Sequence, residues 1–595
     1  MKCITSKINH ALKVGNIHCN TCCEYYPCHY KGQNCSFCYC PFYPCEDTDL
    51  GKMISTKHGD IWDCSQCLFN HRNNVVDFSF REFKKLGITS AMDPRIKDVF
   101  IEAKKSIFRL GKCVMVFGAT TDVSFVVAAM CRLLLRRDYV VTPFKLQSVY
   151  NDPRVARIGC YVSTPQNFQC KAAGLTNISM DINPILLKSK GDKAWQVVVN
   201  GKNKREYDVN DYFRNFLCEL GMDIAKGSVD FLKKRYDYVI MEGLDFSLSA
   251  GIENINDVNI EVAKHVGARC ILAVDIESKN FLGGALGRIE PMLENGRQEI
   301  SGIILRALNK DFSNIESTVR QLEEIVKIPV IGVIPHTDIF SNESLRRFAF
   351  TNAVKTNSKK LSIIKFPEVA YLSDIDPLYL EGVAVEYATT PQDLAMTDAI
   401  VIPDTKNILV DIQWLKATGL FDSIRGMAGK VPILGICGGC QMMAKYCLAD
   451  GENQLELEGL GLFDISFRKS RDGTYIAKDS AVLNLADGGK IDGYEIRTVS
   501  AENCKCAPLF MVKTLNNSIP EGFADEGKQL YGTHIHGLFE KAAFRQYFIS
   551  KVYADGVDRI SLDYNDYEEV SLDQLADEFF DALDVRKFWD IFERN

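Results

Sequence analysis

Short apolar runs alternate with helix-length segments along the chain from about Lys112 onward. Six runs in the first part are rich in Val and Ile and are bounded by Gly, Pro or Asp: residues 113–118, 139–144, 236–241, 269–276, 300–305 and 329–335. Apolar runs of this length are typical of strands buried on both faces, and the helical segments between them are typical of crossover connections. The pattern predicts a mostly parallel sheet with helices on both faces.

A second series of apolar runs begins near Phe366 and predicts a second α/β domain. Its members are residues 367–372, 383–388, 398–404, 431–437, 461–467 and 530–537. A polar stretch, residues 351–360, separates this series from the first. Residues 571–592 have the spacing of an acidic amphipathic helix pair. The fold class expected is therefore α/β, with two mostly parallel, doubly wound domains.

The chain has 595 residues, which is too long for one hydrophobic core. We expect a cysteine-rich metal-binding module at residues 1–82, a first α/β domain at 110–350 and a second at 362–595. The net charge of −7 is small for this length and gives no reason to expect nucleic acid or a membrane as partner. No apolar signal segment is visible, so a cytoplasmic protein is expected. Residues 113–131 are the most apolar window, but their polar centre indicates a strand, a turn and a buried helix.

Cysteine is the unusual part of the composition, because eleven of the 22 cysteines lie within the first 67 residues. A disulfide scaffold belongs to secreted proteins, so clustered thiols in this context indicate metal binding. Closely spaced pairs place two sulfurs on one turn, and zinc is the first choice because it suits tetrahedral sulfur sites. An iron–sulfur cluster remains an alternative, since thiolates serve both. The candidate ligands are Cys19, Cys22, Cys28, Cys35, Cys38, Cys40, Cys45, Cys64 and Cys67.

The stretch "VPILGICGGCQMM" (residues 431–443) carries the strongest chemical signal. A buried strand ends at Cys437 and a helix pattern follows, which places the thiol on a sharp turn at a helix N-terminus that favours the thiolate. Gly438 and Gly439 are expected there because other residues do not tolerate the backbone of such a turn. We predict that Cys437 is a nucleophile.

A thiolate nucleophile needs a base, and "YGTHIHGLFE" (residues 531–540) offers two histidines at the end of a later strand. Because side chains alternate along a strand, His534 and His536 are expected on one face. His536 precedes Gly537 and is the better candidate for the base.

These stretches resemble the class I glutamine amidotransferase domain of the cobyric acid synthase family. The resemblance runs from about Lys112 to the C-terminus and includes "PFKLQS" (143–148), "MDINPILLKSKGDKAWQVVVNGK" (180–202), "PEVAYLSDIDPL" (367–378) and "GYEI" (493–496). It implies a P-loop, dethiobiotin-synthetase-like fold for the first α/β domain and a class I glutamine amidotransferase fold for the second. The N-terminal segment resembles a family of small cysteine-rich domains whose role is poorly defined.

The resemblance also implies a two-part reaction in cobalamin biosynthesis. Cys437 would form a thioester with glutamine, His536 would act as acid and base, and backbone N–H groups near Gly438 would hold the oxyanion. The released ammonia would reach the first domain, where ATP and Mg²⁺ would convert a corrinoid carboxylate to an acyl phosphate and then to an amide. The substrate would be cobyrinic a,c-diamide and the product cobyric acid.

The nucleotide loop departs from the family pattern, because the expected Gly-Lys pair is missing between Val123 and Ser124. The retained phosphate-binding candidates are Gly118, Thr120, Thr121, Asp122 and Ser124. Lys145 or Lys279 would then have to replace the missing lysine. The alternatives are a decayed ATP site, which would leave a corrinoid-binding or regulatory protein, and a sequence that lacks two residues.

Other expected site residues also follow from the resemblance. Asp122 and Glu242 occupy magnesium-ligand positions, and the substrate loop carries Asn183, Lys188 and Asp192.

Further departures from the family pattern concern charged residues. The residues after Asp275 read "ESKN", and Arg306 stands at the nucleotide base position. The family's Pro-Gly-Ser-Lys-Asn loop beside the oxyanion contains Asp404 in place of glycine. An acidic side chain there is unfavourable unless it points away from the oxyanion.

Overall fold

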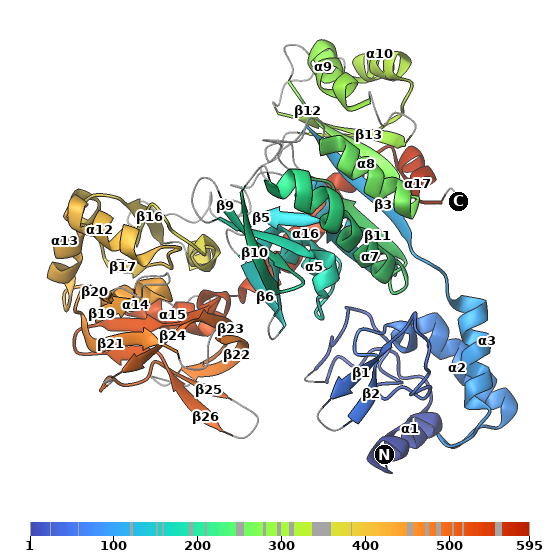
Figure 1. The fold of residues 1–595 in the computed structure, drawn as a ribbon, viewed down its shortest axis with the longest axis horizontal. Helices are drawn as coiled ribbons and strands as arrows, with labels where there is room; N and C mark the ends of the chain where they lie inside the picture. Colours follow the sequence, from blue (N-terminus) through green and yellow to red (C-terminus); the bar gives the residue numbers. More distant parts are fainter. Residues whose placement is uncertain are drawn as a thin grey trace. The chain divides into compact units, whose positions relative to one another are not determined.

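The computed structural model divides the chain into two compact units (Figure 1). The first contains residues 1–150, 162–337 and 572–595, and the second contains residues 151–161 and 338–571. The structure describes residues 2–23, 25–56, 59–119, 123–149, 153–157, 160–189, 194–208, 211–244, 255–277, 281–293, 299–308, 315–335, 359–381, 383–448, 456–470, 475–483, 489–502, 505–513, 517–553 and 562–593.

A six-stranded parallel sheet forms the centre of the first unit. Its order is β14 (Val330–Ile334), β13 (Ile300–Ala307), β12 (Arg269–Ile276), β3 (Lys112–Ala119), β11 (Tyr238–Glu242) and β4 (Val141–Lys145). All six predicted strands are therefore confirmed. Because the strands are parallel, Glu242 ends level with Lys145 on β4 and Asp275 with Arg306 on β13. The register thus brings these two pairs to the carboxyl edge of the sheet.

Helices follow the strands as the alternation predicts. They are α4 (Val123–Leu135), α5 (Thr164–Ala172), η3, a π-helix (Tyr212–Gly221), α7 (Met222–Lys233), α8 (Ile255–Val266), α9 (Phe281–Leu293) and α10 (Ile315–Val326). In Figure 1, α7 and α8 lie over one face of the sheet, against β11 and β3. The apolar window 113–131 forms β3 and the start of the buried helix α4, as predicted. Among the described helices, none has the length and apolar character needed to cross a membrane.

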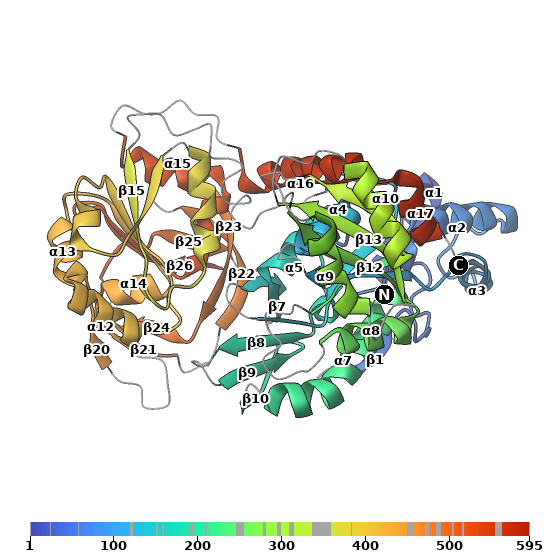
Figure 2. The ribbon, with the colours of Figure 1, turned by 90° about the horizontal axis from the view of Figure 1, so that it is seen from above.

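A smaller four-stranded sheet flanks the large one. Figure 2 shows β8 (Ile185–Ser189), β9 (Ala194–Val199) and β10 (Lys202–Asp208) side by side, and β5 (Gln147–Val149) completes the order β10-β9-β8-β5. A 3₁₀ turn, η2 (Met180–Ile182), precedes it. Strands β6 (Pro153–Arg157) and β7 (Cys160–Ser163) form a separate pair.

The N-terminal module has its own apolar core and packs on the first sheet domain. Its elements are α1 (Lys2–Val14), β1 (Lys52–Thr56), β2 (Gly59–Asp63), η1 (Phe69–His71), α2 (Asn73–Leu86) and α3 (Ile96–Ile107). The core gathers buried aromatic side chains, among them Phe37 and Phe42. Arg72 joins the module to the sheet domain, because its guanidinium pairs with Asp237 and donates to Arg235 O at 2.7 Å.

The second unit is built on another six-stranded sheet. Its order is β16 (Ala384–Ala388), β15 (Lys360–Ile364), β17 (Ala399–Ile402), β18 (Ile433–Ile436), β28 (Leu530–Thr533) and β27 (Phe523–Asp525), and only β27 is antiparallel. The prediction of a strand at residues 367–372 was wrong. That segment leads into the short 3₁₀ turns η7 (Leu372–Asp374) and η8 (Asp376–Glu381), and Tyr371 has φ 50°. Strand β15 begins at Lys360, the last residue of the polar stretch 351–360 that separates the two series of apolar runs.

A mixed sheet, an antiparallel sheet and several helices complete the described part of the second unit. The first sheet contains β20 (Glu456–Glu458), β19 (Ala444–Leu448), β21 (Phe463–Lys469) and β24 (Val499–Glu502), and in it β19 and β21 are parallel. The second contains β26 (Ser518–Glu521), β25 (Phe510–Lys513), β22 (Tyr475–Leu483), β23 (Lys490–Arg497) and β29 (Ile535–His536). The helices are α12 (Ile408–Thr418), α13 (Leu420–Met427), α14 (Gly438–Met443) and α15 (Ala542–Ser550), and short 3₁₀ turns are η9 (Pro391–Leu394) and η10 (Leu538–Glu540).

The C-terminal helix pair is present as α16 (Tyr564–Asp581) and α17 (Val585–Glu593). Residues 572–595 belong to the first unit, although the expected second domain extended to residue 595. The backbone explains this difference, because Val333 N donates to Ala582 O at 3.0 Å and Asp584 N donates to Ile331 O at 2.8 Å. These bonds attach the chain beside β14 at the edge of the first sheet.

Candidate active site

Gly118 is the second-last residue of β3, next to the start of the expected nucleotide loop. A Cβ added to it would lie 1.9 Å from Ala273 O on the neighbouring strand, so only glycine fits. Thr120, Thr121 and Asp122 lie outside the described residues.

Glu242 is buried at the carboxyl end of β11, and four side chains of the same unit contact its carboxylate. Lys145 Nζ lies 2.5 Å from Oε1, and Ser124 Oγ donates to the same oxygen at 2.8 Å. Gln166 Nε2 donates to Oε2 at 3.1 Å, and Gln169 Nε2 donates to Oε2 as well. The residues present therefore do not fit a magnesium ion at Glu242, because an ammonium group and three neutral donors already fill its lone pairs.

Asp275 also forms an ion pair with a cationic side chain, that of Arg306. Arg306 Nε and one terminal nitrogen approach the two carboxylate oxygens at 2.7 and 2.8 Å, which is the bidentate geometry of a strong ion pair. Lys145 and Arg306 thus neutralise the two acidic groups at this edge of the sheet. Lys279 lies outside the described residues.

The described part of the expected substrate loop contains strand β8, which pairs antiparallel with β9. Asn183 is buried, and its amide donates to Lys145 O and Ser148 Oγ at 3.1 Å and accepts from Ser163 N at 3.2 Å. These bonds hold the segment that carries Lys145. Lys188 is exposed on β8 opposite Gln196. Asp192 lies outside the described residues.

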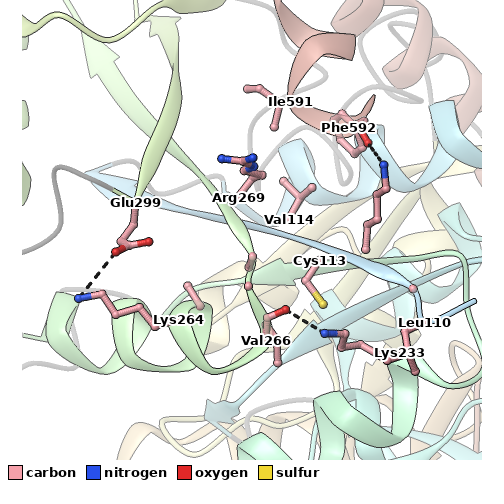
Figure 3. Close-up of a pocket in the computed structure, with 15 residues that line it drawn as sticks. Leu110, Cys113, Val114, Lys233, Lys264, Val266, Arg269, Glu299, Ile591 and Phe592 are labelled. Carbon is pink, nitrogen blue, oxygen red and sulfur yellow. Dashed lines mark hydrogen bonds and ion pairs between the residues drawn. The ribbon is translucent and has the colours of Figure 1, made fainter. Parts of the chain in front are cut away.

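A cavity of about 460 Å³ in the first unit lies at the opposite, amino edge of the sheet (Figure 3). Its three lysines are engaged by main-chain or acidic groups: Lys233 Nζ donates to Val266 O at 2.9 Å, Lys112 Nζ donates to Phe592 O at 3.0 Å, and Lys264 Nζ lies 3.8 Å from Glu299 Oε1. Ligands of open parallel sheets bind at the carboxyl edge, so this cavity is not a nucleotide-site candidate.

The structure sorts the N-terminal cysteines into two groups. Cys40, Cys45, Cys64 and Cys67 line one small cavity of about 20 Å³ together with aromatic side chains. Burial first, and then the thiols of Cys28, Cys35 and Cys23, raise the pKa of Cys38, so these groups are neighbours. Burial raises the pKa of Cys35, and the thiol of Cys19 adds to this shift, so these two groups are also neighbours. Cys22 is exposed in the same loop. The sequence alone does not divide the nine candidate ligands into these two groups.

Cys437 stands on a strained turn between β18 and α14. Its φ of 50° and ψ of −107° are unusual for a residue with a side chain, and such strain costs about 1–3 kcal/mol and concentrates at functional sites. Its N–H donates to Thr533 O at 2.7 Å, which fixes the turn on β28.

The two glycines after Cys437 are required for space. A Cβ at Gly439 would lie 2.0 Å from Ile402 O, and one at Gly438 would lie 2.7 Å from Asp404 Oδ1. The expectation that these glycines supply the unusual backbone conformation was wrong, since the residue with positive φ at this turn is Cys437 itself.

His536 is fully buried on β29 and is oriented by Asp374. Its Nδ1 donates to Asp374 Oδ2 at 2.7 Å, and Asp374 Oδ1 accepts from Gly537 N at 2.8 Å. The ring packs against Tyr371 and Tyr494, with centroids 4.2 and 5.3 Å apart. Asp374 was not predicted as a site residue, although the "DIDPL" motif that carries it was noted for its resemblance to the family.

His534 does not share this environment. Its backbone N–H donates to Glu521 Oε1 at 2.8 Å, and its ring packs on Phe467. The expectation that the two histidines lie on one face was wrong, because the strand breaks at His534 and continues as β29 in another sheet.

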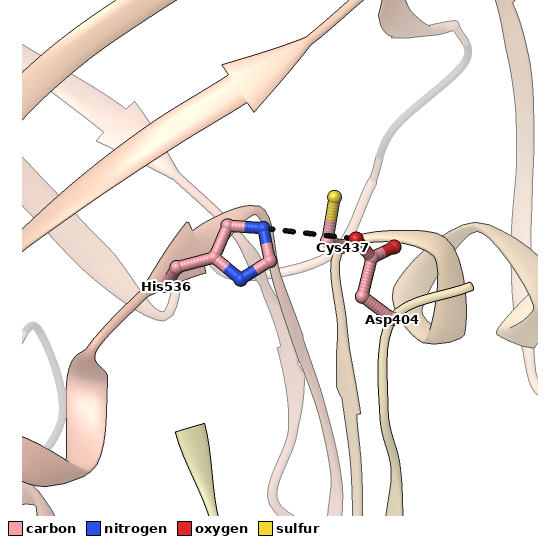
Figure 4. A group of neighbouring side chains, drawn as sticks. All are labelled: Asp404, Cys437 and His536. Carbon is pink, nitrogen blue, oxygen red and sulfur yellow. Dashed lines mark ion pairs between the residues drawn. The ribbon is translucent and has the colours of Figure 1, made fainter. Parts of the chain in front are cut away.

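The structure brings Cys437 and His536 together. The thiol, a ring nitrogen of His536 and a carboxylate oxygen of Asp404 all lie within 4.8 Å of one another, and Figure 4 shows the three side chains converging from separate segments. His536 Nε2 is 3.9 Å from Asp404 Oδ2. Nucleophile and base candidates are thus close enough for proton transfer after a small side-chain movement.

Asp404 points into this centre rather than away from it. Its Oδ1 accepts from Gly438 N at 2.7 Å, at the N-terminus of α14. Burial raises the pKa of the Asp404 carboxyl, while His536 and the Gly438 N–H oppose that shift. Burial, and then the charge of Asp404, raise the pKa of the Cys437 thiol well above its usual range. In this arrangement the resting sulfur is a neutral thiol.

Comparisons with known families agree with this architecture. A CobB/CobQ-like glutamine amidotransferase domain matches residues 360–544, an AAA domain matches residues 186–344, and a cysteine-rich small domain matches residues 15–91. Together with the strand-to-helix thiol turn, they define an enzyme of the glutamine-dependent amidotransferase and ligase class.

Relatives narrow the class to one family. A probable cobyric acid synthase of Methanosarcina barkeri (strain Fusaro / DSM 804) is 32% identical over 499 residues, covering 81% of this chain and 99% of the relative. A cobyric acid synthase of Dehalococcoides mccartyi (strain CBDB1) is 29% identical over 506 residues, covering 81% of this chain and 99% of the relative. The chain belongs to the cobyric acid synthase family.

Proposed function

We propose that this enzyme uses ATP and glutamine to amidate side-chain carboxylates of a corrinoid, converting cobyrinic a,c-diamide to cobyric acid. The observation that carries the proposal is the placement of Cys437 on a strained turn within reach of a histidine oriented by Asp374. Relatives named as cobyric acid synthases support the choice of substrate.

In the glutamine half, the Cys437 sulfur attacks the side-chain amide carbon and its proton passes to His536. The Gly438 N–H stabilises the oxyanion of the tetrahedral intermediate. When the C–N bond breaks, His536 returns the proton to the leaving nitrogen and ammonia departs, and water then hydrolyses the thioester to glutamate. Asp374 keeps the proton on Nδ1, so that Nε2 faces the thiol.

In the synthetic half, ATP phosphorylates a corrinoid carboxylate, and ammonia displaces phosphate from the acyl phosphate to give the amide. A carboxylate needs this activation because it is a poor acyl donor to ammonia. Lys145 would have to leave Glu242 to serve as the phosphate-binding lysine. Mg²⁺ would supply charge to the phosphates, but the closed contacts of Glu242 give it no site there.

The N-terminal module is proposed to hold Zn²⁺ at Cys40, Cys45, Cys64 and Cys67. These four thiols line one cavity of about 20 Å³, and zinc is preferred because it suits tetrahedral sulfur sites. The sulfurs must close further around the ion, because among the described residues only Asp404, Cys437 and His536 bring three ligand atoms within 4.8 Å. Metal analysis of the purified chain should show bound zinc. Cys64→Ser should lower the zinc content, whereas the control Cys218→Ser should leave it unchanged.

The test of the proposal is a mass-spectrometric assay on the full chain with cobyrinic diamide, ATP and glutamine. Each new amide lowers the corrinoid mass by the difference between a hydroxyl and an amino group. Cys437→Ala should stop amidation with glutamine but not with ammonium salts. The rival function is corrinoid binding without amidation, which the paired cations at Glu242 and Asp275 favour. Binding of the corrinoid with unchanged mass under both nitrogen sources would establish the rival.

A further inference from the structure

We propose that Asp404 occupies the oxyanion hole of the glutaminase centre and keeps glutamine hydrolysis switched off until its side chain moves away. This inference rests on the proposed glutaminase role of Cys437. It assigns to Asp404 the control of when the centre accepts its substrate.

The hydrogen bond of Gly438 is the first step of the argument. In nucleophile turns the N–H of the residue after the nucleophile stabilises the oxyanion, at 2.7–3.1 Å from the oxygen. Asp404 Oδ1 accepts that N–H at 2.7 Å. A substrate oxygen cannot use the same donor at the same time. An oxygen of Asp404 accepts this bond in either protonation state of the carboxyl group, so protonation alone does not vacate the position.

The charge of Asp404 acts in the same direction. The carboxylate accepts a hydrogen bond from the Cys437 thiol and raises its pKa, which disfavours the thiolate. It also lies 3.9 Å from His536 Nε2, where it competes for the proton that the base must take up and return. A second negative charge in the form of an oxyanion would be repelled at this position.

The loop around Asp404 is fixed on both sides. Ala370 N donates to Asp404 O at 2.9 Å. Thr405 Oγ1 donates to Asp411, and Asn407 caps α12 by accepting from Val410 N at 3.2 Å. Because the backbone is held by these contacts, opening the centre is confined to rotation of the Asp404 side chain.

Two substitutions of Asp404 separate the effect of its hydrogen bond from the effect of its charge. The family pattern has glycine where this chain has Asp404, and glycine has no side chain to reach Gly438 N. Asp404→Gly therefore restores the family residue and removes both the hydrogen bond and the charge. Asp404→Asn removes the charge but keeps an oxygen acceptor of the same shape, so this pair of variants separates the two effects.

The experiment measures glutamate formation from glutamine by the full chain, without ATP or corrinoid. Asp404→Gly should hydrolyse glutamine about 100-fold faster than the wild type, since one oxyanion donor contributes about 10²–10³ in rate. Asp404→Asn should gain less than about tenfold. Its Cys437 should nevertheless react faster with iodoacetamide, as measured on the Cys437 peptide by mass spectrometry. Cys437→Ala added to Asp404→Gly should remove the gain.

Three results would overturn the proposal. One is an Asp404→Gly variant that melts like the wild type and still hydrolyses glutamine within about twofold of it. Another is an Asp404→Asn variant as active as Asp404→Gly, because charge alone would then be the cause. The third is activation of the wild type by EDTA. A metal ion bound by Asp404, Cys437 and His536, rather than the Asp404 side chain alone, would then be what inhibits glutamine hydrolysis. If Asp404→Gly does not fold, Asp404→Ala is measured in the same way.

The outcome is separate from that of the proposed function. An active Asp404→Gly variant that leaves the corrinoid mass unchanged supports the oxyanion-hole assignment and rejects the corrinoid reaction. An inactive variant that still amidates the corrinoid with ammonium rejects the assignment alone.

Discussion

Asp374 Oδ2 lies 2.7 Å from His536 Nδ1, across 162 residues of chain. The carboxylate also holds the backbone of the next residue, since Asp374 Oδ1 accepts from Gly537 N at 2.8 Å. One side chain therefore sets both the orientation and the tautomer of the histidine. This is the role of the third member in a nucleophile–histidine–acid arrangement.

Asp374→Asn is expected to lower glutamine hydrolysis by about 10²–10⁴-fold relative to its parent, because an amide in place of the carboxylate favours the wrong tautomer of His536. The measurement is kcat for glutamate formation, made in the wild type and in the Asp404→Gly background. Asp376→Asn, in the same motif, is the matched control and should change kcat little. Equal effects of the two substitutions would contradict the assigned role.

Gly439→Ala is expected to destabilise the second unit by about 1–3 kcal/mol, because its Cβ would lie 2.0 Å from Ile402 O. Gly426→Ala is the control: this helical glycine of α13 has no atom within 4 Å of an added Cβ. Alanine there should stabilise by about 0.5–1 kcal/mol. Thermal unfolding of both variants tests the pair, and a neutral Gly439→Ala would disprove the packing argument.

Lys145→Met is expected to destabilise the first unit by about 3–5 kcal/mol, since it leaves the buried Glu242 carboxylate without its cation. The side chains of the pair are only 9% and 1% exposed. Adding Glu242→Gln should recover part of the loss, which a double-mutant cycle measures by denaturant unfolding. Lys85→Met is the control, because its pair with Glu82 is on the surface and contributes little. No recovery in the double variant would show that the two groups are not coupled.

Asp411 is expected to give the second unit a stability that falls as the pH rises from about 4 to about 6. Burial raises the pKa of Asp411 to about 6, against hydrogen bonds from Thr405 and Glu368. A carboxyl group with a raised folded-state pKa binds its proton more tightly when folded, so its contribution is complete below about pH 4. Urea unfolding over this range should show a slope that Asp411→Asn lacks.

Asp393 provides the contrast for that measurement. Backbone hydrogen bonds from Thr389 and Thr390 lower the pKa of its carboxyl group. Its contribution is therefore present above about pH 4 and is lost as the pH falls. Asp393→Asn should remove a slope of the opposite sign, which urea unfolding below about pH 4 measures. An Asp393→Asn variant that keeps the wild-type slope below about pH 4 would contradict the assignment.

The sheets could be predicted because their strands are apolar runs with local boundaries. Each of the six strands of the first sheet lies within about two residues of its predicted run. Residues 367–372 have an apolar composition like that of the true strands. Pro367 and the positive φ of Tyr371 nevertheless lead this segment into a turn. Strand β15 was missed because it is only five residues long and begins at Lys360, within the polar stretch 351–360.

The candidate site was predictable only where its signal is local. Cys437 lies in a short motif that predicts a strand-to-helix turn, and His536 lies in one that predicts the end of a strand. The contact of Asp374 with His536 depends on tertiary packing, and so does the direction of the Asp404 side chain. The break of the strand at His534 follows from pairing with another sheet, which alternation along one strand does not contain.

The return of α17 to β13 and β14 has a consequence for synthesis on the ribosome. Strand β14 emerges early, but the segment that covers its edge is translated only after the whole amidotransferase unit. During that interval an apolar strand edge stays open to wrong pairing. A nascent chain that stalls before residue 572 therefore lacks the segment that pairs with β14. We expect chaperones to retain such truncated chains.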